Sequence, residues 1–238
     1  MDKIPKIIHQ VWSDKIRPLP LFFTELSETW KNIYPNWDYI LWDDEKMDAF
    51  IKKHYPEYYS YCRSFPYDVQ RWDTVRYLFL YKSGGMYVDF DYEAVEPLDD
   101  ICLNHSCCFA SEPKEHAHLF GKDVNIINNG LIITEPGHPF IKEIIDCVMS
   151  KYPASGIYRD KMEEVLLTTG PLMITDLYEG YNNKSDVYII PPEIVAPLNK
   201  PEVADFINNE ELSPEYRMAL EKKLEKAKAV HYFVGSWY

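Results

Sequence analysis

Two aspartates separated by one residue end an apolar run in "YKSGGMYVDFDYEAVEPL", residues 81–98. The run predicts a buried strand, and residues at i and i+2 of a strand point to the same side, so we expect Asp89 and Asp91 to face one point. Two like charges at so short a distance repel each other unless a cation lies between them or one of them is protonated. Carboxylates suit Mg²⁺ or Mn²⁺, ions that also bridge substrate phosphates. The pattern indicates a cation that holds a diphosphate; two solvated aspartates in a turn are the alternative.

A second charged pair lies in the segment "YDVQRWDTVRYLFLYKSGG", residues 67–85. Apolar residues recur there at helical spacing until Gly84 and Gly85, which predicts a helix that ends in a glycine turn. Asp73 and Arg76 are three residues apart and therefore share a face of this helix. They could form a simple ion pair with each other. Alternatively they contact a ligand, because a guanidinium beside a departing diphosphate would stabilise the developing negative charge.

Alternating strand and helix patterns must position these residues. The predicted strands are apolar or β-branched runs at residues 5–12, 37–44, 86–91, 106–111, 127–134 and 186–192. The predicted helices cover residues 18–35, 43–58, 67–83, 138–152 and 214–230, the last with Ser213 as its N-cap. The β-α-β-α order at the start predicts one α/β domain over residues 1–238, built on a parallel sheet with helical crossovers.

Bulk composition excludes some classes of protein. The formal net charge of −13 argues against general nucleic-acid binding, which depends on Lys and Arg meeting phosphates. No stretch approaches the roughly 20 apolar residues needed to cross a membrane, so no transmembrane segment is expected. The first residues also lack the apolar core of a signal peptide. We therefore expect a cytoplasmic protein, with peripheral contact at the inner face of the membrane as an alternative.

Cysteine and histidine residues in "CLNHSCC" and "HAH" raise the question of a zinc site. The candidates are His105, Cys107, Cys108, His116 and His118. Their spacing fits no common zinc pattern, because a C-x₂-C pair is absent. We expect a buried strand followed by a loop instead. The chain has five cysteines, and their odd count and irregular spacing indicate reduced thiols.

The segment "WDTVRYLFLYKSGGMYVDFD", residues 72–91, resembles the signature of glycosyltransferase family 32 and of the related glucosylating bacterial toxins. The resemblance extends, in the family's order, to "IPKIIHQVW" at 4–12, "NNG" at 128–130, "TTGP" at 168–171 and "HYFVGSW" at 231–237. Residues 176–212 carry no such motif. The resemblance implies a GT-A fold, with a Rossmann-like, mainly parallel central sheet flanked by helices, as a single glycosyltransferase domain.

The same resemblance implies roles around the acidic pair. Asp91 looks like the direct metal ligand, and Asp89 like the residue that contacts the ribose and a metal-bound water. His231 stands where related enzymes place a further metal or diphosphate ligand, and neutral imidazole suits Mn²⁺. Ser236 and Trp237 match residues that close over the diphosphate. A final strand that only packs aromatic side chains is the alternative for this segment.

Four further residues are implied on the donor side. Trp12 resembles the tryptophan that stacks on the nucleotide base, although a core position is the commoner fate of a lone Trp. Asp73 and Arg76 would reach the donor sugar hydroxyls and the glycosidic oxygen. Either Asn128 or Asn129 would lie near the sugar, and the resemblance does not choose between them.

The activity implied by the resemblance is a metal-dependent glycosyltransferase that retains anomeric configuration. It would move a hexose from a nucleotide sugar, in the first place a UDP-sugar, to a hydroxyl of a glycan or lipid-linked glycan in surface polysaccharide synthesis. We expect a front-face route, in which the leaving phosphate takes the acceptor proton. A non-catalytic nucleotide-sugar-binding protein is the alternative. An aspartate-nucleophile phosphatase fits less well, because Glu93 stands where that class has Thr or Val.

Overall fold

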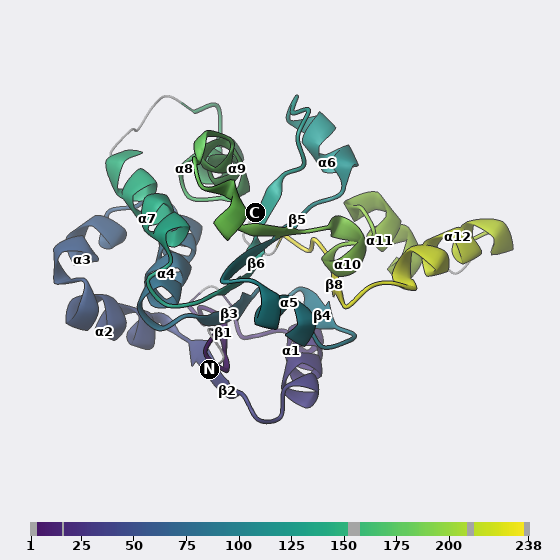
Figure 1. The fold of residues 1–238 in the computed structure, drawn as a ribbon, viewed down its shortest axis with the longest axis horizontal. Coiled ribbons are helices and arrows are strands. Elements are labelled where there is room, and N and C mark those ends of the chain that lie inside the picture. The colour runs from purple at the N-terminus through teal and green to yellow at the C-terminus, as the bar shows by residue number, and fades with distance from the viewer. Residues whose placement is uncertain (1–3, 16, 152–157, 209–211, 236–238) are drawn as a thin grey trace.

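A computed structural model describes residues 4–15, 17–151, 158–208 and 212–235. Its centre is a six-stranded sheet with the strand order β2-β1-β3-β6-β5-β7 (Figure 1). Strand β6 is antiparallel to both of its neighbours, and the other pairings in this sheet are parallel. The mainly parallel α/β architecture predicted from the sequence is therefore confirmed.

The bounds of the elements follow the predicted pattern in most places. The strands of the central sheet are β1 (Ile7–Val11), β2 (Asp38–Trp42), β3 (Gly85–Val88), β5 (Cys107–Ser111), β6 (Ile127–Thr134) and β7 (Tyr188–Ile190). The helices of the first half are α1 (Leu21–Ile33), α2 (Asp44–His54), α3 (Pro56–Arg63), α4 (Asp68–Ser83), α5 (Asp99–Asn104) and α6 (Lys114–Leu119). Those of the second half are α7 (Pro139–Lys151), α8 (Lys161–Thr168), α9 (Pro171–Gly180), α10 (Pro192–Val195), α11 (Lys200–Asn208) and α12 (Pro214–Leu224), with a 3₁₀ turn η1 (Lys184–Asp186).

Alternate residues of the sheet pack into two separate hydrophobic cores. Tyr87 and Ile132 join the core that contains residues of α2, α3, α4, α7 and α9. Their neighbours Met86 and Ile133 join the core that contains residues of α1, α5 and α10. Because successive strand residues point to opposite faces, the sheet is covered on both sides, as Figure 1 shows.

Two glycines join the long helix α4 to the central strand β3. Gly84 ends the helix at φ 64°, and Gly85 opens the strand at φ 101°. Both angles lie in the region that favours glycine. A Cβ on Gly85 would also come within 2.7 Å of the carbonyl oxygen of Ile7 in β1. The Gly-Gly pair therefore serves the turn and the close approach of two strands, which places the residues after β3 at the sheet edge.

Four sequence expectations about the elements were wrong. The helix predicted over 214–230 ends at Leu224, and the last two residues of the predicted range belong to a strand that spans 229–231. The strand predicted over 86–91 ends at Val88, so Asp89 and Asp91 lie in a turn and not on a strand. The helix predicted over 43–58 is two helices, because Pro56 begins α3 at its first position, where its missing N–H is not needed. Residues 114–119 form helix α6 and not a loop. The expected buried strand at Cys107 and Cys108 is present as β5.

A short second sheet was not predicted. Strand β4 (Tyr92–Ala94) follows the acidic turn and pairs antiparallel with β8 (Ala229–His231). The pairing sets Tyr92 opposite His231 and so brings a distant segment beside the acidic pair. Each strand has three residues, too few for a periodic signal in the sequence.

Other expectations can be compared directly with the described residues. Ser213 caps α12 by accepting a hydrogen bond from the Tyr216 N–H at 3.2 Å, as predicted. All five cysteines lie within the described ranges and none forms a disulfide there. In the part of the chain that the structure describes, no helix combines the length and the apolar character needed to cross a membrane.

Candidate functional site: a cavity at one edge of the sheet

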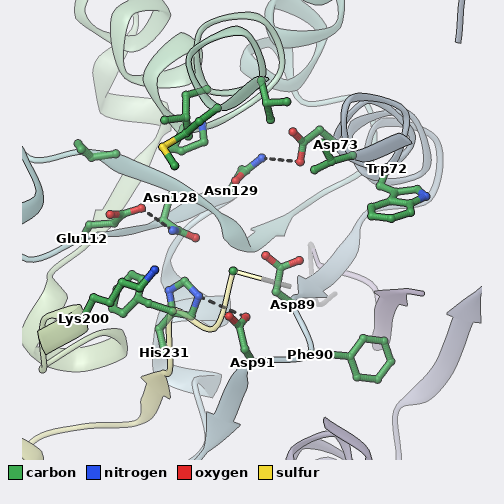
Figure 2. A pocket seen from close by; sticks show the side chains of 18 of the residues that line it. Trp72, Asp73, Asp89, Phe90, Asp91, Glu112, Asn128, Asn129, Lys200 and His231 are labelled. Carbon is green, nitrogen blue, oxygen red and sulfur yellow. Dashed lines mark hydrogen bonds and ion pairs between the residues drawn. The ribbon is translucent and has the colours of Figure 1, made fainter. Parts of the chain in front are cut away.

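Side chains from the ends of four neighbouring strands, three of them polar and one aromatic, meet at one edge of the central sheet. Trp12 follows β1, Asp89 follows β3, Asn128 lies near the start of β6 and Glu112 follows β5. Because β6 is antiparallel, its first residues meet the last residues of β3 and β5. All four line one cavity of about 600 Å³, seen from close by in Figure 2. Open α/β sheets bind their ligands at this edge, beyond the carboxyl ends of the strands.

Asp89 and Asp91 both reach this cavity from the turn between β3 and β4. Burial raises the pKa of Asp89, Arg76 opposes that rise, and the charge of Asp91 adds to it. Burial would likewise raise the pKa of Asp91, but His231 and the Val234 N–H lower it overall. The turn therefore holds two carboxylates that repel each other, and the second stays ionised.

His231 completes the acidic end of the cavity. Its Nε2 lies 3.3 Å from Asp91 Oδ1, and its ring stacks on Tyr92 with centroids 4.1 Å apart. Although burial lowers the pKa of His231, the charge of Asp91 raises it overall. Its Nδ1 is buried without a hydrogen-bond partner among the described residues. A buried ring nitrogen without a partner, on a histidine that is paired with Asp91, is a chemical reason to expect a ligand here.

The acidic end fits a divalent cation that takes part of its coordination from a substrate. Within the described ranges, no group of three or more His, Cys, Asp or Glu side chains is arranged to hold a metal ion alone. Mg²⁺ usually keeps several waters and binds through one or two carboxylates plus substrate phosphates. Asp89 and Asp91 suit that requirement, and the imidazole of His231, when neutral, suits Mn²⁺. The same finding leaves the cysteine- and histidine-rich segment at 102–118 without a zinc cluster in its described residues.

Asp73 and Arg76 form a buried ion pair that also lines the cavity. Arg76 Nη2 lies 3.0 Å from Asp73 Oδ1, and Nη1 donates to the Asn129 carbonyl at 2.8 Å and lies 3.4 Å from Asp89 Oδ1. The two residues are 4% and 6% exposed, so the pair is not a solvated surface bridge. Burial lowers the pKa of Arg76, but Asp89, Tyr87 and Asp73 raise it overall. The guanidinium is a fixed positive charge beside the acidic turn.

Asp73 lies beside the cavity and is held by the side chains of Arg76, Asn129 and Thr169. Its Oδ1 accepts from Asn129 Nδ2 at 3.0 Å, and its Oδ2 accepts from Thr169 Oγ at 2.8 Å. Burial raises the pKa of Asp73 to about 6, against the lowering by Arg76 and Thr169. The threonine belongs to "TTGP", so that segment supports a carboxylate that faces the cavity.

Asn128 and Asn129 both line the cavity but have different partners. Asn129 Nδ2 also donates to the Tyr77 hydroxyl at 2.9 Å, so its amide is bound to α4. Asn128 Nδ2 donates to Glu112 Oε1 at 2.7 Å, which Figure 2 shows as a dashed line across the cavity wall. A Cβ on Gly130 would come within 2.7 Å of both Asn128 Oδ1 and Asp89 Oδ2. The glycine of "NNG" therefore makes room for the carboxylate.

Trp12 lies at the opposite end of the sheet edge from Glu112. Its ring meets Phe23 and Phe90 edge to face, with centroids 5.6 and 5.8 Å apart, and Nε1 donates to the Arg17 carbonyl at 3.1 Å. It is half-buried and lines the cavity, so it is both part of an aromatic cluster and open to a ligand. Ser236 and Trp237, expected to close over a diphosphate, lie outside the described residues.

Comparison with known families identifies the acidic turn. Residues 22–108 match the family model described as "Glycosyltransferase sugar-binding region containing DXD motif". This segment of the chain is similar to that glycosyltransferase family. The match includes Asp73, Arg76, Asp89 and Asp91, so the motif that the sequence resembled is confirmed.

Curated relatives of this chain include several mannosyltransferases. The chain is 28% identical to inositol phosphoceramide mannosyltransferase 3 of Schizosaccharomyces pombe, over 80% of this chain and 51% of that protein. It is 31% identical to mannosyl phosphorylinositol ceramide synthase CSH1 of Saccharomyces cerevisiae, over 77% of this chain and 44% of that protein. The chain thus spans about half the length of the curated relatives it matches.

The fold of this chain also has a solved counterpart. The structure of the PaToxG glycosyltransferase matches with a TM-score of 0.53 at 17% identity, over 94% of this chain and 84% of that one. At that identity the likeness concerns the fold alone. It agrees with the predicted GT-A fold, a mainly parallel sheet flanked by helices.

Glu112 and His116 are among the cavity residues that the sequence does not predict as site residues. Glu112 was not considered at all, and His116 only as a zinc ligand. Both line the cavity, and His116 Nδ1 lies 2.8 Å from Glu112 Oε2. One signal was available, because Glu112 directly follows a predicted strand, where sheet-edge residues collect.

Trp12→Ala should weaken the binding of a nucleoside diphosphate by this protein. Loss of one base–aromatic stack is expected to cost about 1–3 kcal/mol, whereas Trp12→Phe should keep part of the affinity. Titration calorimetry would measure this, with the melting temperature of each variant as a control for the lost contacts to Phe23 and Phe90. Unchanged affinity in Trp12→Ala would assign Trp12 to the aromatic cluster alone.

Proposed function

We propose that this protein transfers a hexose from a nucleotide diphosphate sugar to an acceptor hydroxyl, with a divalent cation at the acidic turn. One observation carries the proposal. A buried Arg76 and the two carboxylates Asp89 and Asp91 line the same cavity as an aromatic side chain, Trp12, that could stack on a base. Diphosphate, cation, sugar and base each find matching chemistry along one sheet edge.

The protein's own side chains mainly bind and neutralise in this proposal. Arg76 would hold positive charge against the departing diphosphate, and Asp73 would accept hydrogen bonds from sugar hydroxyls. Asp73 suits this because its carboxylate is already fixed by Asn129 and Thr169 and loses little freedom on binding. A cation bound at Asp89 and Asp91 would supply further charge neutralisation of the phosphates. We propose a front-face route with retention of configuration.

The proposed donor is a nucleotide sugar whose hexose remains to be assigned. A UDP-sugar was the expectation from the sequence, and the relatives' names favour mannose as the transferred hexose. A screen of UDP-glucose, UDP-galactose, UDP-N-acetylglucosamine and GDP-mannose, read by released nucleotide with Mn²⁺ or with a chelator, tests the function. Metal-dependent release from one donor supports it. Binding of a donor without any release would favour the non-catalytic nucleotide-sugar-binding alternative.

The acceptor side of the cavity has apolar walls. Beyond the asparagines, the lining comes from α6, α8 and α9 and from the segment before β6, namely Leu119, Phe120, Ile126, Met162, Val165, Leu166 and Leu172. Leu119 and Met162 are 78% and 41% exposed, so apolar surface continues to the rim. Together with relatives named for inositol phosphoceramide, these walls support an acceptor with a lipid portion. We propose a lipid or lipid-linked glycan in preference to a free polysaccharide.

An alkyl chain on the acceptor should therefore improve its use. We expect octyl α-mannoside to have a KM at least tenfold below that of methyl α-mannoside, because burial of each CH₂ contributes up to about 0.8 kcal/mol. Met162→Glu should reduce this preference, and Met218→Glu should not. Met218 is the matched control because it is also an exposed methionine, but it lies on α12 and does not line the cavity. Equal KM values for the two glycosides in the unmodified protein would contradict the proposed lipid acceptor.

A further inference from the structure

Glu112 is a buried carboxylate on the cavity wall that the DXD motif and the ion pair do not include. It is 9% exposed and follows the last residue of β5. Oε1 accepts from Asn128 Nδ2 at 2.7 Å, and Oε2 lies 2.8 Å from His116 Nδ1. A carboxylate offers about four acceptor positions, so these two bonds leave others for a ligand.

His116 fixes this carboxylate from helix α6. The main-chain N–H of Lys200 donates to His116 Nε2 at 3.1 Å, so Nε2 must be the acceptor and cannot carry the proton. In the neutral ring the proton is therefore on Nδ1, where it is donated to Glu112. The ring also packs edge to face on Phe233, with centroids 4.6 Å apart. Three chain segments thus determine the orientation of His116 and, through it, that of Glu112.

The order of the strands indicates what Glu112 faces. Along the sheet edge the sequence of lining residues is Trp12 after β1, Asp89 after β3, Asn128 in β6 and Glu112 after β5. With a base at Trp12 and a diphosphate at Asp89, the sugar lies toward β6. Glu112 therefore lies beyond the sugar, on the side of the apolar walls. Figure 2 shows it on the opposite side of the cavity from Trp72 and Phe90.

We propose that Glu112 accepts a hydrogen bond from the acceptor hydroxyl and directs its oxygen at the anomeric carbon, with His116 as its positioning residue. The inference rests on the proposed function. In the reaction the bond from the acceptor oxygen to the anomeric carbon forms, and the bond from that carbon to the phosphate oxygen breaks. The single hydroxyl proton is shared between Glu112 and the departing phosphate oxygen and moves to the phosphate as the new bond forms, so Glu112 remains a carboxylate throughout. Its contribution is orientation of the nucleophile.

The test compares transfer to methyl α-mannoside with hydrolysis of the donor, in which water is the acceptor. Glu112→Gln should lower transfer at least 30-fold and raise the KM for methyl α-mannoside, while hydrolysis and nucleoside diphosphate affinity stay within threefold. His116→Phe keeps the packing on Phe233 but cannot donate, and should lower transfer similarly. His116→Asn restores a donor and should recover most of the transfer. Melting temperatures check that each variant is folded.

The outcomes separate this inference from the proposed function. A parallel fall of transfer and hydrolysis in Glu112→Gln would place Glu112 on the donor and overturn the inference. A Glu112→Gln variant in which neither transfer nor hydrolysis falls would also overturn the inference. Either result leaves the proposed function intact as long as the unmodified protein releases nucleotide from a donor. Absence of release from every donor would overturn both.

Discussion

Asp91→Asn is expected to abolish metal-dependent turnover while the protein stays folded. The change removes one charge and keeps the shape, and the amide oxygen can still accept the hydrogen bond that Val234 N–H now gives to Oδ2 at 2.9 Å. What is lost is the anionic oxygen that a hard cation prefers. Nucleotide release at saturating Mn²⁺ and metal-dependent nucleotide binding would both be measured.

The matched control for Asp91→Asn is Asp99→Asn, an equally conservative change at an exposed residue in the first turn of α5. It should leave turnover and metal-dependent binding at the level of the unmodified protein. If Asp91→Asn instead retained activity within threefold of that level, the assignment of Asp91 as a metal ligand would be wrong.

Arg76→Ala should lower the rate of donor turnover about 10²–10³-fold, because it removes a preorganised positive charge beside the departing diphosphate. It should also destabilise the fold, since the buried Asp73 would be left without its positive partner, a loss of about 3–5 kcal/mol. Arg76→Lys separates these effects. It keeps the charge and most of the stability but cannot make all three contacts of the guanidinium.

Arg71 provides the control for this prediction. It lies on the same helix, is equally buried and is paired with Asp44 and Asp48, but it does not line the cavity. Arg71→Lys should lower the melting temperature about as much as Arg76→Lys and leave turnover unchanged. Equal loss of turnover in the two variants would mean that Arg76 only stabilises the fold. Nucleotide affinity should change little in either, since Trp12 and the acidic turn are intact.

Long periodic segments were predictable because their signals are local. Helix α4 has apolar residues on nearly every side and ends at a glycine pair, and it was predicted to within a residue or two. Strand β6 is a run of eight buried residues and was predicted over the same range, but its antiparallel direction was not predicted. Direction depends on the connections between elements, which periodicity does not encode.

The site was partly predictable for a related reason. Asp89 and Asp91 could be identified because a motif lies in consecutive residues. Glu112 and His116 reach the cavity through the pairing of β5 with β6, whose register shifts between Phe109 and Ser111. Such an irregularity re-aims the residues that follow, and nothing local in the sequence marks it.

The pairing of β4 with β8 has a consequence for synthesis of the chain. The acidic turn is completed by a hydrogen bond between Asp91 and Val234, which are 143 residues apart. At a translation rate of about 5–20 residues per second, Asp91 leaves the ribosomal active site about 7–30 s before Val234 does. During that time the nascent domain has its two repelling carboxylates but neither His231 nor the strand that holds them. The proposed capacity to bind a cation and a nucleotide sugar should therefore arise only after translation has passed residue 234.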